Sequence, residues 1–145
     1  MKVSQKTDYA LRALFVLAQA EPAGGSVRTA EIAKREKIPV KFLEAILVEL
    51  RRSGFVQSQR GAEGGHRLAR PASEVTVGDV WRVLDGPLSP VADLDGSKRK
   101  GPAVGVFETV WDEVGKVAAE VVDAVTLEDM VRRAEASRDV LDFNI

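Results

Sequence analysis

The residues with the clearest chemical meaning lie between Arg60 and Arg70, where arginines flank a stretch rich in glycine. Short, largely apolar pieces, Phe55-Val56 and residues 67–69, stand on either side, and this pattern predicts a β-hairpin with a permissive turn. The tip carries no large apolar side chain, so it gains little by packing on its own protein. Glycines let a partner molecule come close to the backbone, and the flanking arginines would attract a partner that is negatively charged. Because a helix-turn-helix pattern precedes the hairpin, DNA is the expected partner.

Three helical segments precede this hairpin. The first begins within residues 4–8 and runs to about Ala20, with a broad apolar face typical of a buried helix. The second is short, with Thr29 as its N-cap, and stops near Ile38. Pro39 suits the first turn of the third, whose inward residues are Leu43, Ile46, Leu47 and Leu50. The short turn between the second and third helices is typical of a helix-turn-helix.

Beyond the hairpin, Thr76 caps a helix that ends near Leu84, and a Gly-, Pro- and Ser-rich linker follows. From Val104 to Val125 apolar residues recur with heptad spacing, which predicts a helix of roughly 30 Å. A stripe this wide needs a partner, and we favour a second copy of the chain over packing back onto the same domain. The expected dimer interface comprises Phe107, Val110, Trp111, Val114, Val117, Ala118 and Val121.

The fold class expected is therefore mainly α with a small β-hairpin wing. Residues 1–85 would form a winged helix-turn-helix DNA-binding domain, and residues 86–103 a linker loop. Residues 104–145 would hold the dimerisation helix, a short helix from Thr126 to about Glu135, and an apolar tail that docks on the protein. No internal repeat is evident.

Composition supports a globular protein and limits its chemistry. The chain has 145 residues, 45% hydrophobic and 30% charged, with no apolar run near the ~20 residues of a membrane span. We expect a cytoplasmic protein with no membrane partner. Without cysteine there is no thiolate metal site, and the single histidine, His66, makes an enzyme implausible. His66 either touches phosphate or sits on the solvated surface.

Charge is distributed unevenly along the chain. Residues 1–71 hold 13 Lys+Arg against 7 Asp+Glu, whereas residues 72–145 hold 8 against 15. The net charge of −1 thus hides a basic half suited to a polyanion and an acidic half that faces elsewhere. The alternative is chance segregation of solvated charge.

The segments "DYALRALFVLA", "FLEAILVELRRSGFVQSQRG", "GGHRLAR", "VTVGDVWRVLDG" and "TLEDM" closely resemble the Rrf2 family of bacterial transcription regulators. The resemblance runs from about residue 1 to residue 135. It implies a homodimeric repressor that binds a palindromic operator in double-stranded DNA. It also implies these DNA-contacting residues: Lys6, Thr7, Tyr9, Arg28, Thr29, Val40, Lys41, Glu44, Ala45, Arg60, Gly61, Gly64 and Gly65. The wing departs from the family's glycine-only tip at Ala62 and Glu63, where a carboxylate would repel phosphate.

Sensing is the larger departure from the family. Relatives that bind an iron–sulfur cluster carry three cysteines, and the matching positions here are Asp93, Arg99 and Gly105. The resemblance is therefore to a cluster-free branch, with no cofactor or metal and with a small molecule or partner protein as effector. Trp81 and Trp111 are either core residues or the walls of an effector pocket. The alternative function is a winged-helix protein–protein interaction module without sequence-specific DNA binding.

Overall fold

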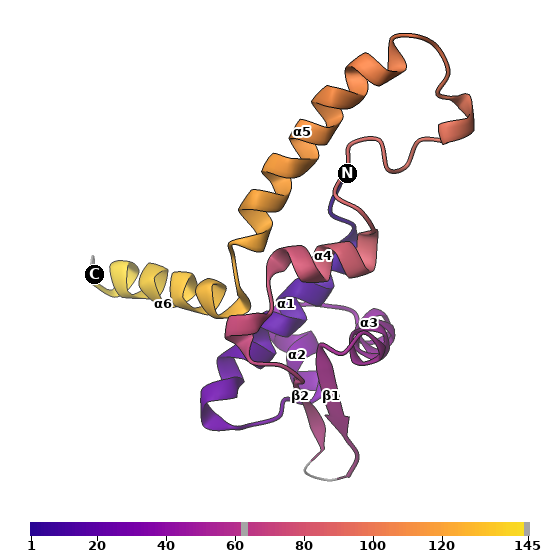
Figure 1. Ribbon diagram of the computed structural model, residues 1–145. Helices are drawn as coiled ribbons and strands as arrows, with labels where there is room; N and C mark the ends of the chain where they lie inside the picture. Colours follow the sequence, from indigo (N-terminus) through magenta and orange to yellow (C-terminus); the bar gives the residue numbers. More distant parts are fainter. Residues whose placement is uncertain (62–63, 144–145) are drawn as a thin grey trace.

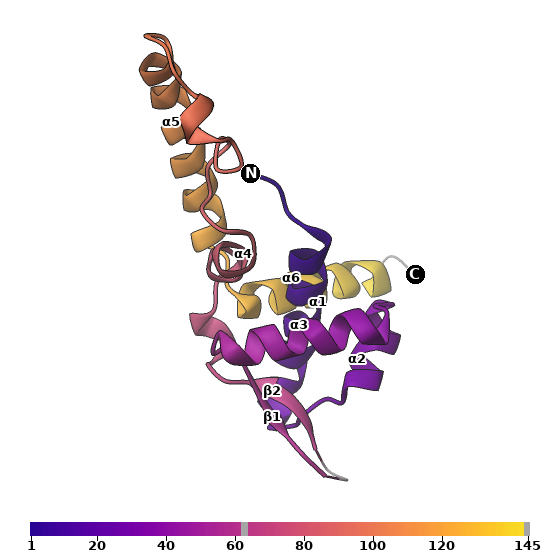
Figure 2. The ribbon, with the colours of Figure 1, turned by 90° about the vertical axis from the view of Figure 1, so that its right-hand side faces the viewer.

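The computed structural model describes residues 1–61 and 64–143 of the chain (Figure 1). Its helices and strands, in chain order, are α1 (Gln5–Ala20), α2 (Thr29–Glu36), α3 (Val40–Arg52), β1 (Val56–Gln59), β2 (Gly65–Leu68), α4 (Val77–Asp85), α5 (Val104–Asp123) and α6 (Leu127–Phe143), with single 3-10 turns at Glu21–Ala23, Ala72–Glu74 and Gly96–Lys98. The prediction of a mainly helical fold with a hairpin wing is confirmed. The hairpin and α5 project from opposite ends of the body in both views (Figures 1 and 2).

Helix α1 forms the centre of the body because small and branched apolar residues line several of its sides. Ala10, Ala13 and Leu14 are fully buried, and Leu17 is nearly so. The helix begins where its N-cap, Ser4, accepts a hydrogen bond from the backbone N–H of Thr7. The bounds of this helix agree with the prediction from the sequence.

The helix-turn-helix is built from α2 and α3. Helix α2 ends at Glu36, and its C-cap residue, Lys37, has a left-handed φ of 54° that turns the chain into α3. The four inward residues predicted for α3 are all buried in the core. The predicted N-cap of α2 is wrong: Arg28 occupies the cap position, and the hydroxyl of Thr29 instead contacts the imidazole of His66. Tertiary contact thus replaces local capping at this residue.

The wing is an antiparallel hairpin in which Val56 pairs with Leu68 and Gln59 with Gly65. Val27, just before α2, exchanges two backbone hydrogen bonds with His66. It thereby forms an isolated antiparallel bridge beside the second strand of the hairpin. Phe55 is buried at the base of the hairpin, with the guanidinium of Arg70 4.7 Å from its ring centroid. Ala62 and Glu63, the expected departure at the tip, lie outside the described residues.

Two short, similar segments join the winged helix to the C-terminal helices. Each reads Val-Thr-x-x-Asp, once at residues 75–79 and again at residues 125–129, and each forms a capping box. The segments pair antiparallel, with Val77 N–H donating to the Val125 carbonyl and Leu127 N–H to the Val75 carbonyl, both at 2.9 Å. The end of α5 and the start of α6 are thereby fixed to the start of α4. The residues that the two segments share are those of the capping box together with the preceding valine.

Helix α5 is held at its C-terminal end and along the returning loop. Arg82 on α4 makes a bidentate pair with Asp123 at 2.6 and 2.7 Å, which raises the pKa of Arg82 and lowers that of Asp123. The loop before α5 runs back along it, so closely that a Cβ at Gly115 would collide with the carbonyl oxygen of Leu88.

Helix α6 is longer than expected, because it continues from the predicted end near Glu135 to Phe143. Its first residue, Leu127, is buried in the same core as α1. Val140 and Leu141 are exposed by 59% and 67%, so this part of the predicted apolar tail does not dock on the chain. Asn144 and Ile145 fall outside the described residues. None of the described helices is long and apolar enough to cross a membrane.

Candidate nucleic-acid interface

The first turns of α3 present a continuous exposed face. Val40 is 47% exposed and Phe42 62%, while Lys41, Glu44 and Ala45 are also exposed. The opposite side of the helix is fixed in the core by Leu43 and its inward neighbours. Phe42 was absent from the predicted site, although the same helical period that points Leu43 inward turns Phe42 outward.

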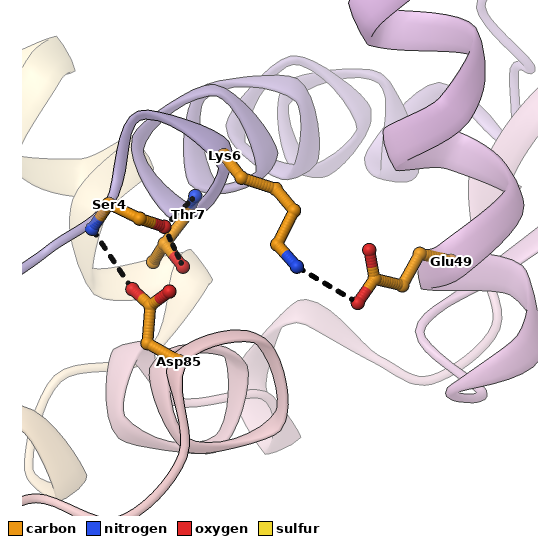
Figure 3. Close-up of polar contacts among 5 residues, drawn as sticks. All are labelled: Ser4, Lys6, Thr7, Glu49 and Asp85. Atoms are coloured by element: carbon orange, nitrogen blue, oxygen red, sulfur yellow. Dashed lines mark hydrogen bonds and ion pairs between the residues drawn. The ribbon is translucent and has the colours of Figure 1, made fainter. Parts of the chain in front are cut away.

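The start of α1 lies beside this face. The Nζ atom of Lys6 lies 3.3 Å from a carboxylate oxygen of Glu49 on α3, an ion pair that ties the two helices together (Figure 3). Both side chains remain about two-fifths exposed, at 43% and 41%, so Lys6 can still turn toward a phosphate. Tyr9 is half-buried next to them and its hydroxyl accepts a hydrogen bond from Gln5 at 3.1 Å.

Thr7 does not lie on this surface, and its predicted phosphate contact is wrong. Its residue is fully buried, and its hydroxyl accepts a hydrogen bond from Ser4 at 3.3 Å (Figure 3). Ser4 N–H donates in turn to the carboxylate of Asp85 at 3.0 Å. Partial burial acts to raise the pKa of Asp85, but hydrogen bonds from Ser4 and Thr7 outweigh it and lower the pKa. Thr7 therefore belongs to a polar cluster that ties α1 to the end of α4.

The wing places a glycine-rich turn beside two arginines. Arg60 is exposed where the first strand ends, and Arg28 is exposed across a hollow of about 240 Å³ between the hairpin and the start of α2. Gly61 has a φ of 111°, which a side chain would strain, and a Cβ at Gly64 would collide with the carbonyl oxygen of Gln59. Gly65 begins the second strand. The glycine types at this tip are therefore required by the turn itself.

His66 is half-buried, and both of its ring nitrogens are engaged by hydroxyl groups within the chain. Its Nε2 atom lies 2.8 Å from the hydroxyl of Thr29, and its Nδ1 atom lies 2.8 Å from that of Ser58. Burial lowers the pKa of His66, and the nearby charge of Arg51 lowers it further. The imidazole thus joins the wing to the first turn of α2, a role that sequence spacing could not reveal.

Glu44 lies in the angle between α3 and the wing. It lines a hollow of about 200 Å³ together with Arg51 of α3 and Ser58 and His66 of the hairpin. Among the residues that the structure describes, Glu44 forms no salt bridge, not even with Lys41 three residues earlier on α3. Its carboxylate remains available to an outside donor.

Helix α5 keeps most of its apolar stripe uncovered. The exposed fractions are 56% for Phe107, 53% for Val117 and 62% for Val121, and Val110 and Val114 are also exposed. Trp111 and Ala118, at the side of the stripe, are half-buried. The alternative that this stripe packs back on its own domain is therefore wrong for the five exposed residues.

Trp81 and Trp111 do not share the hollow that lies beside Trp81. Trp81 donates its indole N–H to the Lys2 carbonyl at 3.2 Å and lines a small hollow of about 90 Å³ beside Asp85 and Asp93. Trp111 is not among the residues that line this hollow. The hollow at Trp81 is thus not the pocket expected between the two tryptophans.

The donor atoms do not fit an iron–sulfur cluster. The chain has no cysteine. Of the three positions that match cluster ligands, Arg99 is paired with Glu108 at 2.7 Å, and Gly105 carries no ligating side chain. Residues 1–61 and 64–143 bring together no group of three His, Cys, Asp or Glu side chains around a metal position.

Known proteins with related sequences are transcriptional regulators. The profile of the Rrf2 family, described as an iron-dependent transcriptional regulator, matches residues 3–133. The HTH-type transcriptional regulator CymR of Bacillus subtilis is 33% identical over 145 residues, covering 100% of both chains. The HTH-type regulator Rv1287 of Mycobacterium tuberculosis is 39% identical over 132 residues, which span 90% of this chain and 81% of that protein.

Solved structures show the same likeness. IscR of T. potens is 38% identical, with a TM-score of 0.76, and the match covers 94% of this chain and 90% of that one. The structure of CymR, described as the global cysteine regulator of B. subtilis, is 34% identical with a TM-score of 0.77, covering 92% and 98%. The winged-helix arrangement is thus shared along almost the whole chain.

Proposed function

The chain belongs to the Rrf2 family of transcriptional regulators, and from that premise we propose that it is a homodimeric, sequence-specific DNA-binding repressor. Its matched relatives are regulators and not enzymes. We further propose that its operator is palindromic and that a small molecule or partner protein, rather than an iron–sulfur cluster, controls it. A DNA target implies a location in the bacterial cytoplasm.

One observation carries the proposal of DNA binding: the outer face of α3 is exposed beside a projecting wing. Figure 2 shows α3 lying across the body just above the hairpin. Recognition helices read base edges in the major groove with their N-terminal residues, which here are Val40, Lys41, Glu44 and Ala45. Arg60 and Arg28 stand beside the wing, where a guanidinium suits the electronegative minor groove.

The proposal of a homodimer comes from the exposed stripe of α5. Apolar side chains at heptad spacing are favoured in helix pairs, since each pair removes them from water. A twofold pair of winged helices presents two recognition helices, and such proteins bind half-sites spaced by helical turns of DNA. The palindromic operator follows from that symmetry.

Selection of bound fragments from a random DNA pool, followed by sequencing, tests the proposed function directly. We expect a palindromic consensus, against which Arg60→Ala weakens binding to all sequences and lowers the salt slope by about one. Arg138→Ala, on exposed α6 far from the wing, is the control and should bind as the parent does. No enrichment from the pool, together with unchanged binding by Arg60→Ala, would instead favour a protein-interaction module.

A further inference from the structure

A hollow that the DNA-binding face and the α5 stripe do not use lies where α1, α4 and α6 meet. Its volume is about 340 Å³, and its walls are Leu11 and Phe15 of α1, Val77 of α4, and Leu127 and Met130 of α6. Leu11, Phe15 and Met130 are only half-buried, so their apolar surface is partly uncovered within the chain. The size falls in the range of pockets that take small organic ligands, roughly 300–1,000 Å³.

Two of these walls belong to the junction that fixes α5. Val77 and Leu127 directly follow the capping threonines Thr76 and Thr126, whose segments pair through backbone hydrogen bonds. The end of α5 at Asp123 is only a few residues from Leu127. A molecule in the hollow would therefore touch the central helix of the DNA-binding domain and the joint that sets the direction of α5.

The charged residues at this hollow are both cationic. Arg12 of α1 and Arg133 of α6 complete the lining. Arg12 is already committed, because its guanidinium lies 3.6 Å from Asp8 and 3.7 Å from Glu36 and donates to the Glu36 carbonyl at 3.0 Å. Arg133 is exposed and makes no ion pair within 4.0 Å in the described part of the chain, although its charge acts on Asp129, one turn earlier on α6. An anionic group in the hollow could therefore form a direct ion pair with Arg133.

We propose that this hollow is a binding site for an amphipathic organic acid, whose apolar body lies on Phe15, Leu127 and Met130 and whose carboxylate pairs with Arg133. A carboxylate and a guanidinium form charge-assisted hydrogen bonds, while the apolar walls exclude water from the body of the ligand. The positive charge of Arg133 favours a negatively charged ligand, and the apolar walls favour a ligand with an apolar body.

The inference that this hollow is the effector site of a regulator rests on the proposed function. The ligand would bridge α1 to α6 and change the preferred angle of the junction, and with it the spacing between the two recognition helices of a dimer. Coupling of this kind is reciprocal, so operator DNA and ligand must change each other's affinity by the same factor.

Binding itself can be measured without DNA by isothermal titration of the full chain with 2-naphthoate and with its neutral analogue 2-naphthamide. We expect one saturable site per chain for the acid, and binding about tenfold weaker for the amide and for Arg133→Gln. Met130→Trp should abolish binding by filling the hollow, with its folding checked by circular dichroism. Arg132→Gln is the matched control, since this neighbouring arginine pairs with Glu128 and does not line the hollow.

Three results would overturn the site: no saturable binding of either probe, equal binding of acid and amide, or binding that survives both Arg133→Gln and Met130→Trp. Loss of dimer mass in Met130→Trp would also overturn it, because a second copy would then cover the hollow. The regulatory role has its own measurement, which is operator affinity with and without saturating 2-naphthoate. An acid that binds as expected but leaves operator affinity unchanged would refute the coupling alone, whereas absence of any operator would refute the proposed function.

Discussion

Two exposed helical faces, one of α3 on the body and one of projecting α5, differ sharply in chemistry. The outer face of α3 mixes a cation, an anion and apolar groups, as Lys41, Glu44 and Phe42 show. The outer face of α5 is an unbroken apolar stripe that includes Phe107 and Val121. The side chains of both faces are exposed to a similar degree, but one face is chemically mixed and the other is apolar.

The difference indicates two different partners. An apolar stripe gains free energy only where water leaves it, which a matching apolar stripe allows. A mixed face gains from directed hydrogen bonds and contacts with methyl groups, which base edges in a DNA groove provide. Substitutions on either face, or at a residue behind them, therefore test whether the two roles are separate.

The largest effect is expected from Val114→Asp at the middle of the α5 stripe. A carboxylate buried in an apolar interface costs several kcal/mol, so the variant should be monomeric by light scattering. Its operator affinity should fall at least about a hundredfold, because one winged helix holds only a half-site. Lys116→Asp introduces the same side chain on the exposed opposite side and should remain dimeric. A dimeric Val114→Asp would place the interface elsewhere.

Glu44→Ala tests the mixed face for discrimination rather than attraction. A carboxylate in the major groove accepts from cytosine N4 and repels mismatched sites, so its loss should relax preference at one or two operator positions by about 1–3 kcal/mol. Affinity for unrelated DNA should stay equal or rise. Anisotropy titrations with operator and scrambled DNA at two salt concentrations measure both. Glu31→Ala removes an exposed acid on α2 and is the control; an unchanged operator-to-scrambled ratio in Glu44→Ala would make Glu44 a surface acid.

Periodicity made much of the fold predictable. The inward residues of α3, the cap at Thr76 and the stripe of α5 all follow from local spacing, and each lies where the sequence indicates. The end of α6 was missed because polar residues after Glu135 give no apolar period, although the helix continues.

The errors in the site share a different cause, which is contact between segments distant in sequence. From the sequence alone, Thr7 is a first-turn residue that a phosphate could reach. In the structure Asp85, at the end of α4, approaches the N-terminal turn of α1 and forms hydrogen bonds there. The contact that joins His66 to α2 is with Thr29, which is 37 residues away. The hollow beside Arg133 is likewise assembled from three helices. The pairings of these segments cannot be read from spacing along the chain.

Thr7→Val separates the buried cluster from the DNA-binding face. The variant keeps the shape but loses a hydroxyl that bonds within the core, so unfolding free energy should fall by about 1 kcal/mol. Operator affinity and its salt slope should not change, since no phosphate contact is lost. Thr109→Val, an exposed threonine on α5, should leave both quantities as they are. A lower salt slope at unchanged stability would restore Thr7 to the phosphate-contacting set.

The smallest effect expected concerns the joint between the wing and α2. The pKa of His66 lies below its ordinary value of 6.5, because burial and the charge of Arg51 disfavour the protonated form. The unfolded chain therefore binds more protons than the folded one in that range. The contribution of neutral His66 to the free energy of unfolding is fully present above pH 6.5. It is lost as the pH falls from 6.5 through the lowered pKa of His66 in the folded chain.

Since His66 is the single histidine, its imidazole gives one titration curve by NMR, and carboxylates titrate mainly below about pH 5. Arg51→Gln should raise the measured pKa, whereas Arg52→Gln, an exposed neighbour on α3, should change it less. His66→Gln should lose the decline in melting temperature between pH 7.0 and 5.5 that the parent shows. A pKa at or above 6.5, or equal pH slopes in parent and His66→Gln, would mean that the imidazole is solvated and that the wing is not joined to α2 through it.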